Sequence, residues 1–276
     1  MKKALAVILA LMFVVCAFAA CGGNEEPKPA DETTVADTTV VEETTVEETT
    51  VAEETTVEET TVEETTVEET KGLNSTDIKE VVAFYNAAEA ATKGSAPKGM
   101  SKMTLDGDIT GDGALGVALK VAMPIINSTL EKNSSSTDYI PGDADNSEIK
   151  ESDVTEASAT SKNGVTTIYI KLKDQTDGPQ ADAHTAGPVA RGIGTLGNVD
   201  TAINELGAEI YSGKDTISLK YRDAYIKCTV NEETGKITGG TWHYKVNVNV
   251  ADADLKLGIK IAVKNLKACI DYSVSI

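Results

Sequence analysis

Residues 241–250 read TWHYKVNVNV, and this stretch decides the fold because apolar and polar side chains alternate along it. In an extended chain, successive side chains point to opposite faces. One face carries Trp242, Tyr244, Val246, Val248 and Val250, and the other carries His243, Lys245, Asn247 and Asn249. A strand with one apolar face and one solvated face is typical of an antiparallel sheet that packs one side on a core.

The same alternation predicts further strands along the chain. They lie at residues 100–109, 154–162, 165–173, 216–222, 224–230, 254–264 and 265–276. Two of them flank Asn163-Gly164, a dipeptide that favours a two-residue hairpin turn. The last three strands, near ten residues each, are long for a sheet, and long strands favour twist and curvature.

Two N-terminal stretches favour helix instead. Residues 73–91 place apolar side chains at helical spacing, and Asp77 with Glu80 has the spacing of a capping box. Residues 114–130 repeat the helical pattern, with Pro124 as a kink. A short helix is expected near 200–206, and polar loops at 132–150 and 174–198. We therefore predict an α+β domain with an antiparallel, curved sheet whose apolar face is covered by the N-terminal helices.

The N-terminus has the three parts of an export signal. Lys2 and Lys3 precede an uncharged apolar run at residues 4–18, and small residues follow. Residues 18–23, FAACGG, resemble the lipobox of bacterial lipoproteins, although Phe18 stands where leucine is usual. The resemblance implies that residues 1–20 are a lipoprotein signal peptide. It also implies that Cys21 is lipidated and anchors the chain to the outer, extracytoplasmic face of the cell membrane. The alternative is cleavage after Ala17-Phe18-Ala19, which would release a soluble protein.

A low-complexity segment follows the lipobox. Residues 24–70 hold 17 acidic side chains against one lysine, and from residue 33 they repeat Thr-Thr-Val-Glu-Glu. Such a composition cannot bury enough apolar area to fold. We expect residues 21–72 to be a disordered, lipid-anchored stalk that carries a globular domain at 73–276; similar repeats form stalks of Gram-positive surface proteins. Residues 71–276 carry a net charge of only −5, and the absence of a basic footprint argues against nucleic acid as a partner.

Candidate chemical sites are few and weak. Asp106, Asp108 and Asp112 have calcium-loop spacing, but the twelfth position is Val117 or Leu119 instead of a carboxylate, so a capped turn is the default. A second acidic set, at residues 143–148, is weaker. Residues 192–197, GIGTLG, match a dinucleotide-binding pattern but lack a preceding strand.

Histidine and cysteine positions add little. His184 lies in a loop where Asp177 or Asp182 could orient it, although no nucleophile motif accompanies it. Cys228 shares the phase of the apolar face and Cys269 the phase of the polar face, which disfavours a disulfide without excluding one. A stripe of lysines on the polar face would suit either plain solvation or an anionic wall polymer or lipid headgroup. The stripe consists of Lys245, Lys256, Lys260, Lys264 and Lys267.

These observations lead to a functional expectation without catalysis or a cofactor. We expect a cell-surface lipoprotein that displays a binding or structural domain, with the membrane and the cell wall as its surroundings. The alternative is a carrier of a lipid or other apolar small molecule in a pocket between helices and sheet. Residues 235–242 and 268–272 resemble uncharacterised lipoproteins of anaerobic Gram-positive bacteria, a resemblance that implies a class of organism and no activity.

Overall fold

The computed structural model describes residues 72–92, 99–113, 116, 119, 123–124, 135–137, 148–205, 208–257 and 259–276. The predicted signal peptide, Cys21 and most of the predicted stalk lie outside these residues. Within them, no helix is both long enough and apolar enough to cross a membrane.

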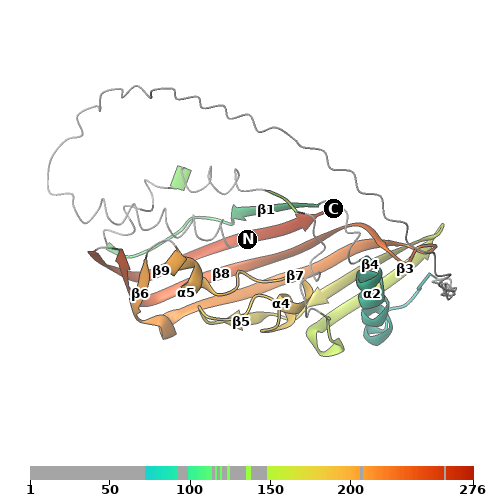
Figure 1. Cartoon of the computed structure of the whole chain (residues 1–276), viewed down its shortest axis with the longest axis horizontal. Helices are drawn as coiled ribbons and strands as arrows, with labels where there is room; N and C mark the ends of the chain where they lie inside the picture. The colour runs from blue at the N-terminus through green and yellow to red at the C-terminus, as the bar shows by residue number, and fades with distance from the viewer. Residues whose placement is uncertain are drawn as a thin grey trace, which may run out of the picture. The chain divides into compact units, whose positions relative to one another are not determined.

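The described chain forms an open, antiparallel sheet of nine strands (Figure 1). The main order is β2-β1-β9-β8-β7-β4-β3, while β5 pairs with β7 and β6 pairs with β8. The strands are β1 Gly99–Leu105, β2 Ser135–Thr137, β3 Val154–Lys162, β4 Val165–Leu172, β5 Gln175–Asp177, β6 Glu209–Ser212, β7 Ile217–Asn231, β8 Ile237–Leu257 and β9 Ile259–Ser275.

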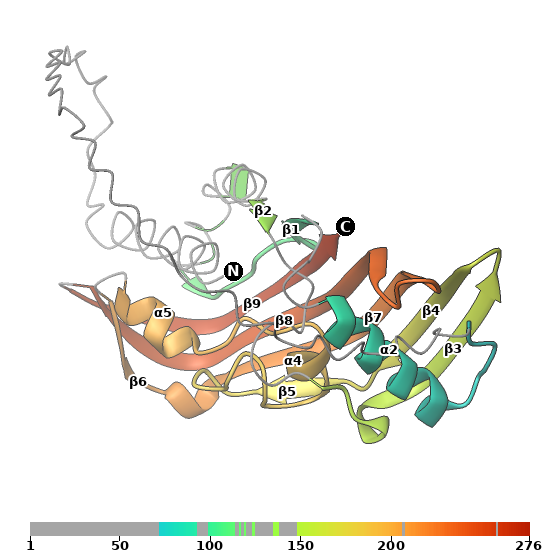
Figure 2. The same cartoon turned by 45° about the vertical axis from the view of Figure 1, so that its right-hand side comes forward.

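The antiparallel sheet with an N-terminal helix on its apolar face is confirmed, but the domain is mostly β because its helices are short. They are α2 Ile78–Thr92, α4 Pro188–Gly192 and α5 Val199–Glu205, with one-turn 3-10 helices η1 Glu151–Asp153 and η2 Lys214–Thr216. Among the helices named above, only α2 comes from the N-terminal part, and it contacts β3, β4 and β8. The predicted helix 114–130 lies largely outside the described residues. Figure 2 shows the three helices against the strands.

The predicted three C-terminal strands are in fact two long ones, β8 and β9. Strand β8 ends at Leu257 and β9 begins at Ile259, so the predicted strand 254–264 is shared between the end of β8 and the start of β9. In both strands the alternation of core-facing and solvent-facing side chains shifts by one residue at the same paired level. On one side of this level the paired core-facing residues are Val250 and Leu266, and on the other side they are Ala253 and Val263. Each strand therefore contains one extra residue at this level, opposite the other, and the prediction of a turn there was wrong.

The two predicted strands 216–222 and 224–230 are one strand, β7, interrupted by a β-bulge. The pairing with β8 shifts between Arg222 and Tyr225, and Asp223 has a left-handed backbone with φ 54°. The β3–β4 hairpin is confirmed. Asn163 and Gly164 both have positive φ, as the tight turn between right-twisted strands requires.

Helix α2 begins five residues later than predicted. Asp77 caps it by accepting a hydrogen bond from the backbone N–H of Glu80 at 3.1 Å. The preceding residues extend the sheet instead, because Ser75 forms a two-way backbone bridge with Ala159 at the edge of β3. The helix buries Tyr85, whose hydroxyl accepts a 3.0 Å hydrogen bond from the indole N–H of Trp242.

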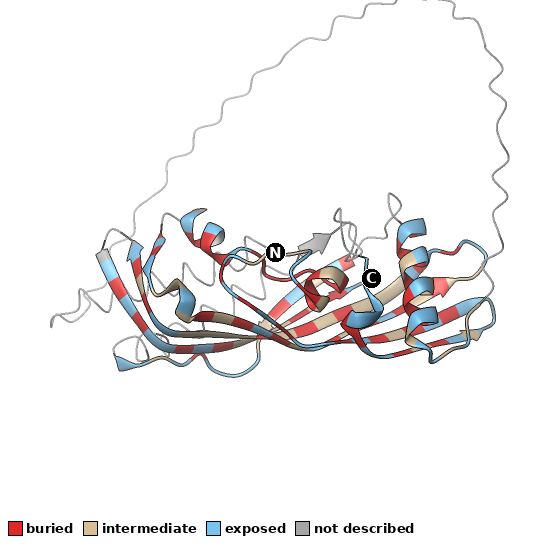
Figure 3. Cartoon of the chain, turned by 90° about the horizontal axis from the view of Figure 1, so that it is seen from below, coloured by how far each residue is buried: buried red, intermediate tan, exposed pale blue. Residues whose placement is uncertain are grey.

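Several local elements were missed in segments predicted to be loops. The loop 174–198 contains β5 and α4. The described part of 132–150 contains β2 and ends at Lys150, the residue before η1. Strand β6 was also missed, whereas α5 matches the helix predicted near 200–206. Figure 3 shows buried and exposed positions alternating along the strands, with α2, α4 and α5 on the same side of the sheet. The opposite, solvated side is called the open face below.

Candidate functional site on the open face

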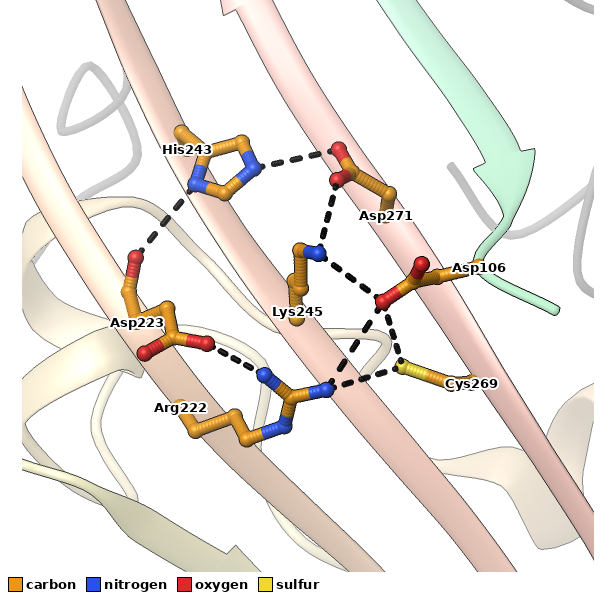
Figure 4. A network of polar contacts seen from close by, with 7 residues as sticks. All are labelled: Asp106, Arg222, Asp223, His243, Lys245, Cys269 and Asp271. Carbon is orange, nitrogen blue, oxygen red and sulfur yellow. Dashed lines mark hydrogen bonds and ion pairs between the residues drawn. The ribbon is translucent and has the colours of Figure 1, made fainter.

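A network of polar side chains lies on the open face where β7, β8, β9 and the segment after β1 come together (Figure 4). It consists of Asp106, Arg222, Asp223, His243, Lys245, Cys269 and Asp271, and we call it the polar network. The bulge in β7 makes it possible. The two consecutive residues Arg222 and Asp223 both lie on the exposed side, while Ala224 is only 1% exposed. Bulges commonly re-aim side chains in this way near functional sites.

Asp106 is the centre of the polar network. Its carboxylate accepts a hydrogen bond from the Lys245 ammonium at 2.8 Å, and the Arg222 guanidinium lies 3.7 Å away. The thiol of Cys269 lies 3.7 Å from the same carboxylate oxygen. Asp106 belongs to the segment that follows β1, whose backbone bonds to Cys269 hold it beside β9. The segment thus brings a carboxylate to a face where β7 supplies the cation Arg222 and β8 supplies the cation Lys245.

The ionisation of the polar network follows from these contacts. The hydrogen bond from Lys245 and its positive charge hold the pKa of the Asp106 carboxyl below its ordinary value. The same bond raises the pKa of the Lys245 ammonium. Burial lowers the pKa of the Arg222 guanidinium, but the interactions with Asp223 and Cys269 together outweigh it and the net shift is upward. Around neutral pH these groups are therefore all charged and mutually compensated.

His243 is held at both ring nitrogens. Nδ1 lies 3.3 Å from the backbone carbonyl oxygen of Asp223, and Nε2 lies 3.1 Å from a carboxylate oxygen of Asp271. Lys245 also lies 3.8 Å from Asp271, which connects the histidine to the rest of the polar network. The imidazole is only 14% exposed. Its orientation is fixed by the bulge on one side and by β9 on the other.

An aromatic row runs from this histidine across the open face. The His243 ring stacks on Tyr225 with centroids 4.9 Å apart, and Tyr225 stacks on Tyr169 at 6.2 Å. Both interplanar angles are 29°, so each ring is stacked on its neighbour with a moderate tilt. The two tyrosines are half-buried on the face that is otherwise polar. The row therefore presents apolar ring surface beside the charged groups.

On its other side the polar network borders a pocket of about 280 Å³. Its lining consists of Asp106, Asp108, Asn247, Asn249, Lys267, Ala268 and Cys269. Among the described residues, neither amide side chain nor the ammonium group of Lys267 has a hydrogen-bond or ion-pair partner. We call this hollow the amide pocket. It offers donors and acceptors that the protein itself leaves unused.

The calcium-like aspartates are not gathered into one site. Asp106 is engaged by Lys245 and Arg222, and Asp112 accepts a hydrogen bond from the side-chain amide of Asn265. Asp108 is exposed and lines the amide pocket. The described residues contain no group of three or more acidic, histidine or cysteine side chains arranged to hold a metal ion. Asp143 and Asp145 lie outside the described residues.

The glycine-rich segment 192–197 is part of the core. Ile193, Thr195 and Leu196 are at most 3% exposed. Its backbone N–H groups are already used: that of Thr195 donates to Ala183 O, and that of Leu196 donates to the Tyr221 hydroxyl. A phosphate-binding loop needs such groups pointing at the ligand. The segment is therefore a packed turn that covers Tyr221.

Asp177 and Asp182, which were expected to orient His184, form hydrogen bonds with other groups instead. The Asp182 carboxylate accepts hydrogen bonds from the backbone N–H groups of His184 and Thr185, which lowers its pKa and caps a turn. Asp177 is buried and binds the side-chain amide of Gln175 at 2.8 and 2.9 Å. Neither carboxylate contacts the imidazole of His184.

The cysteines and lysines follow the predicted faces. Cys228 is buried on the apolar face and Cys269 half-buried on the open face, and both are free thiols. Several lysines of the predicted stripe have partners: Lys245 in the polar network, Lys264 beside Asp252 at 3.8 Å, and Lys260 over the Tyr211 ring at 3.8 Å. The stripe is thus largely compensated and is not one basic patch.

The aromatic row and the central role of Asp106 were not anticipated. A signal for the tyrosines was present, since Tyr169 and Tyr225 are out of phase with the buried Ile168 and Ile226. Comparisons with protein-family models, curated proteins and solved structures find no match for this chain.

Proposed function

We propose that this chain is an extracytoplasmic lipoprotein that displays a non-catalytic binding domain, and that the open face is its binding surface. The polar network with its two flanks, the aromatic row and the amide pocket, carries the proposal. The lipobox at residues 18–23 and the acidic repeat support attachment through Cys21 to the cell membrane. The open face lies on the side of the sheet opposite α2, α4 and α5.

The local cost of building the polar network supports a functional role. A left-handed backbone at a residue other than glycine, as at Asp223, costs on the order of 1–3 kcal/mol unless its surroundings compensate. Exposed ion pairs return little stability. A regular β7 strand without the bulge would be the simpler solution for the fold alone. The bulge instead orders Arg222, Asp223 and His243 on a solvated surface, which is what preorganised binding requires.

The same residues give little support to an enzyme. Cys269 is the cysteine nucleophile within the polar network, but burial raises the pKa of its thiol, and the charge of Arg222, partly offset by the carboxylate of Asp106, does not reverse that shift. A reactive cysteine needs the opposite shift. His243 is engaged at both nitrogens and is not directed at the thiol by any contact. Ordered charges without an activated nucleophile suit recognition better than covalent chemistry.

The carrier alternative receives less support in the described region. Beneath α2 the space against the sheet is occupied by Tyr85, Trp242 and Cys228, each at most 1% exposed. Native mass spectrometry of the exported protein, purified without detergent, tests this alternative. A reproducible extra mass that organic extraction removes would favour the carrier over the displayed binding domain.

Binding of the exported, fluorescently labelled protein to isolated cell walls tests the proposal. We expect saturable binding that the double variant Lys245→Ala/Asn247→Ala weakens at least tenfold. Lys79→Ala is the matched control, because this exposed lysine lies on α2, on the other side of the sheet. Equal binding by all three proteins would contradict a role for the open face. Release of the Cys21→Ala variant from the membrane fraction tests the anchor separately.

A further inference from the structure

We propose that the open face binds a neutral oligosaccharide laid along β8, with its sugar rings against the aromatic row and its hydroxyl groups in the amide pocket. This inference rests on the proposed function and names the chemical class of the ligand. It follows from the charges, the hydrogen-bonding groups and the spacing of the residues already described.

The charge arrangement excludes strongly charged ligands first. Arg222 and Lys245 are each in contact with carboxylates of the polar network, so neither is available to an incoming anion without competition. A phosphate or polyanion would also meet Asp106 and Asp108 at close range. A cation would meet Arg222, Lys245 and Lys267. A neutral ligand avoids both repulsions, because the opposite charges on this surface largely cancel.

The unused groups match hydroxyls. A hydroxyl both donates and accepts hydrogen bonds, and the amide side chains of Asn247 and Asn249 do the same. Asp108 adds an acceptor and Lys267 adds donors, both from the β9 side of these amides. A ligand that carries several hydroxyl groups offers partners for all of these groups. An apolar ligand would leave these groups desolvated without partners, at a cost of about 1–3 kcal/mol for each group.

The aromatic row supplies the complementary apolar contact. Tyr225 is stacked between His243 and Tyr169, so the row presents ring edges to solvent, and the C–H surface of a sugar ring can cover these apolar edges. Tyr169 and Tyr225 leave ring surface partly in water on a solvated sheet face, beside the fixed His243 ring. A ligand that covers these rings removes apolar area from water while its hydroxyls stay near the charged groups.

The spacing sets the length of the ligand. His243 and Asn249 are six residues apart on β8, a separation of about 20 Å at roughly 3.3 Å per residue. Lys245 and Asn247 lie between them on the same face, so the surface is continuous from the aromatic row to the amide pocket. A single sugar cannot reach both ends. The inference is therefore of a short linear oligosaccharide and not of a monosaccharide.

Isothermal titration calorimetry of the exported protein with cellohexaose, chitohexaose and, as a charged probe, polyphosphate tests the inference. We expect saturable binding of at least one hexaose that persists at about 1 M salt, where the Debye length is roughly 3 Å. Tyr225→Ala and Asn249→Ala should each weaken binding at least tenfold. Lys79→Ala, an exposed lysine of α2 on the other side of the sheet, should bind like the wild type. Asn249→Ala keeps the test decisive when Tyr225→Ala lowers stability.

Three results would overturn the inference: neither hexaose binds, both variants bind like the wild type, or only polyphosphate binds and high salt abolishes that binding. A dimer that buries the open face, detected by sedimentation and lost in Tyr225→Ala, would overturn it as well. If cell-wall binding still depends on Lys245 and Asn247 in these cases, the ligand class is wrong and the displayed binding domain stands. If cell-wall binding is also absent, the proposed function fails too.

Discussion

The ion pair between Asp153 and Arg191 offers the sharpest test of how this fold is held together. Asp153 lies at the end of η1, before β3, and Arg191 lies in α4. The carboxylate accepts hydrogen bonds from Arg191 Nε at 2.8 Å, from Arg191 Nη2 at 2.5 Å and from the backbone N–H of Lys150 at 2.9 Å. The side chains are 3% and 17% exposed, so little water screens them.

Replacement of Asp153 by alanine removes all three acceptor contacts and leaves a largely buried guanidinium without its counter-ion. Breaking one partner of a buried pair costs about 3–5 kcal/mol, against 0–1 kcal/mol for a surface pair. Because Arg191 keeps some exposure and still donates to Thr185 O, we expect a loss of about 3 kcal/mol. For a domain of this size that lowers the Tm by roughly 6–12 °C.

Urea unfolding followed by Trp242 fluorescence measures this loss, with Asp174→Ala as an exposed control expected within about 0.5 kcal/mol of the wild type. The double variant Asp153→Ala/Arg191→Met removes the stranded charge as well, so it should recover about 2 kcal/mol relative to the sum of the single changes. A loss below about 1 kcal/mol for Asp153→Ala would refute the reasoning, because the pair would then behave like a surface ion pair.

The same pair has a defined pH dependence. Burial alone would raise the pKa of the Asp153 carboxyl, but the hydrogen bonds from Arg191 and Lys150 outweigh it, and the pKa lies below its ordinary value. The unfolded chain therefore binds the proton more readily. The stabilisation is complete above the ordinary carboxyl pKa of about 3.9 and is lost as the pH falls through the lower folded value. The difference between wild type and Asp153→Ala should shrink over that interval.

Three further outcomes are expected. Burial raises the pKa of Asp177, and the hydrogen bond from Gln175 offsets only part of this shift, so the ionised form is unfavourable in the folded state. Asp177→Asn should therefore raise the Tm at neutral pH. This gain should fade as acid protonates the wild-type carboxyl. Gly240→Ala would place Cβ 2.7 Å from Cys228 Cβ and should cost about 1–3 kcal/mol in urea unfolding, whereas Gly178→Ala, with open space around it, should cost little. Iodoacetamide should label Cys269 before Cys228 in the native protein, because Cys228 is 1% exposed and burial raises the pKa of its thiol; equal labelling rates would contradict the assignment of the two faces.

Local alternation was sufficient to predict the faces of the strands. The apolar phase of residues 242–250, the hairpin at Asn163-Gly164 and the separation of Cys228 from Cys269 each depend on a few neighbouring residues, and each agrees with the structure. Turn placement failed where alternation changes phase inside a strand. Gly258, the one glycine between residues 241 and 276, was the available signal for the true turn.

The candidate site was harder to predict because it depends on register. Asp106 meets Lys245 across 139 positions of sequence, and no local pattern specifies that pairing. The bulge is visible in the sequence as the phase break between Tyr221 and Ala224, but such a break is also typical of the end of a strand, which was the prediction. His243 and the amides of the pocket were assigned to the correct face, but their grouping needed the pairing of β8 with β7 and β9.

The extra residues that β8 and β9 carry at one paired level limit how this hairpin can change in length over evolution. Loss of one residue near Ala251 alone would exchange the core-facing and solvent-facing side chains at the tip of β8, while those of β9 stay as they are. Loss of a second residue near Asn265 would restore the match, because the two positions face each other. Deletions and insertions here should therefore be tolerated as pairs and rejected singly, so homologous chains should differ in this hairpin by even numbers of residues.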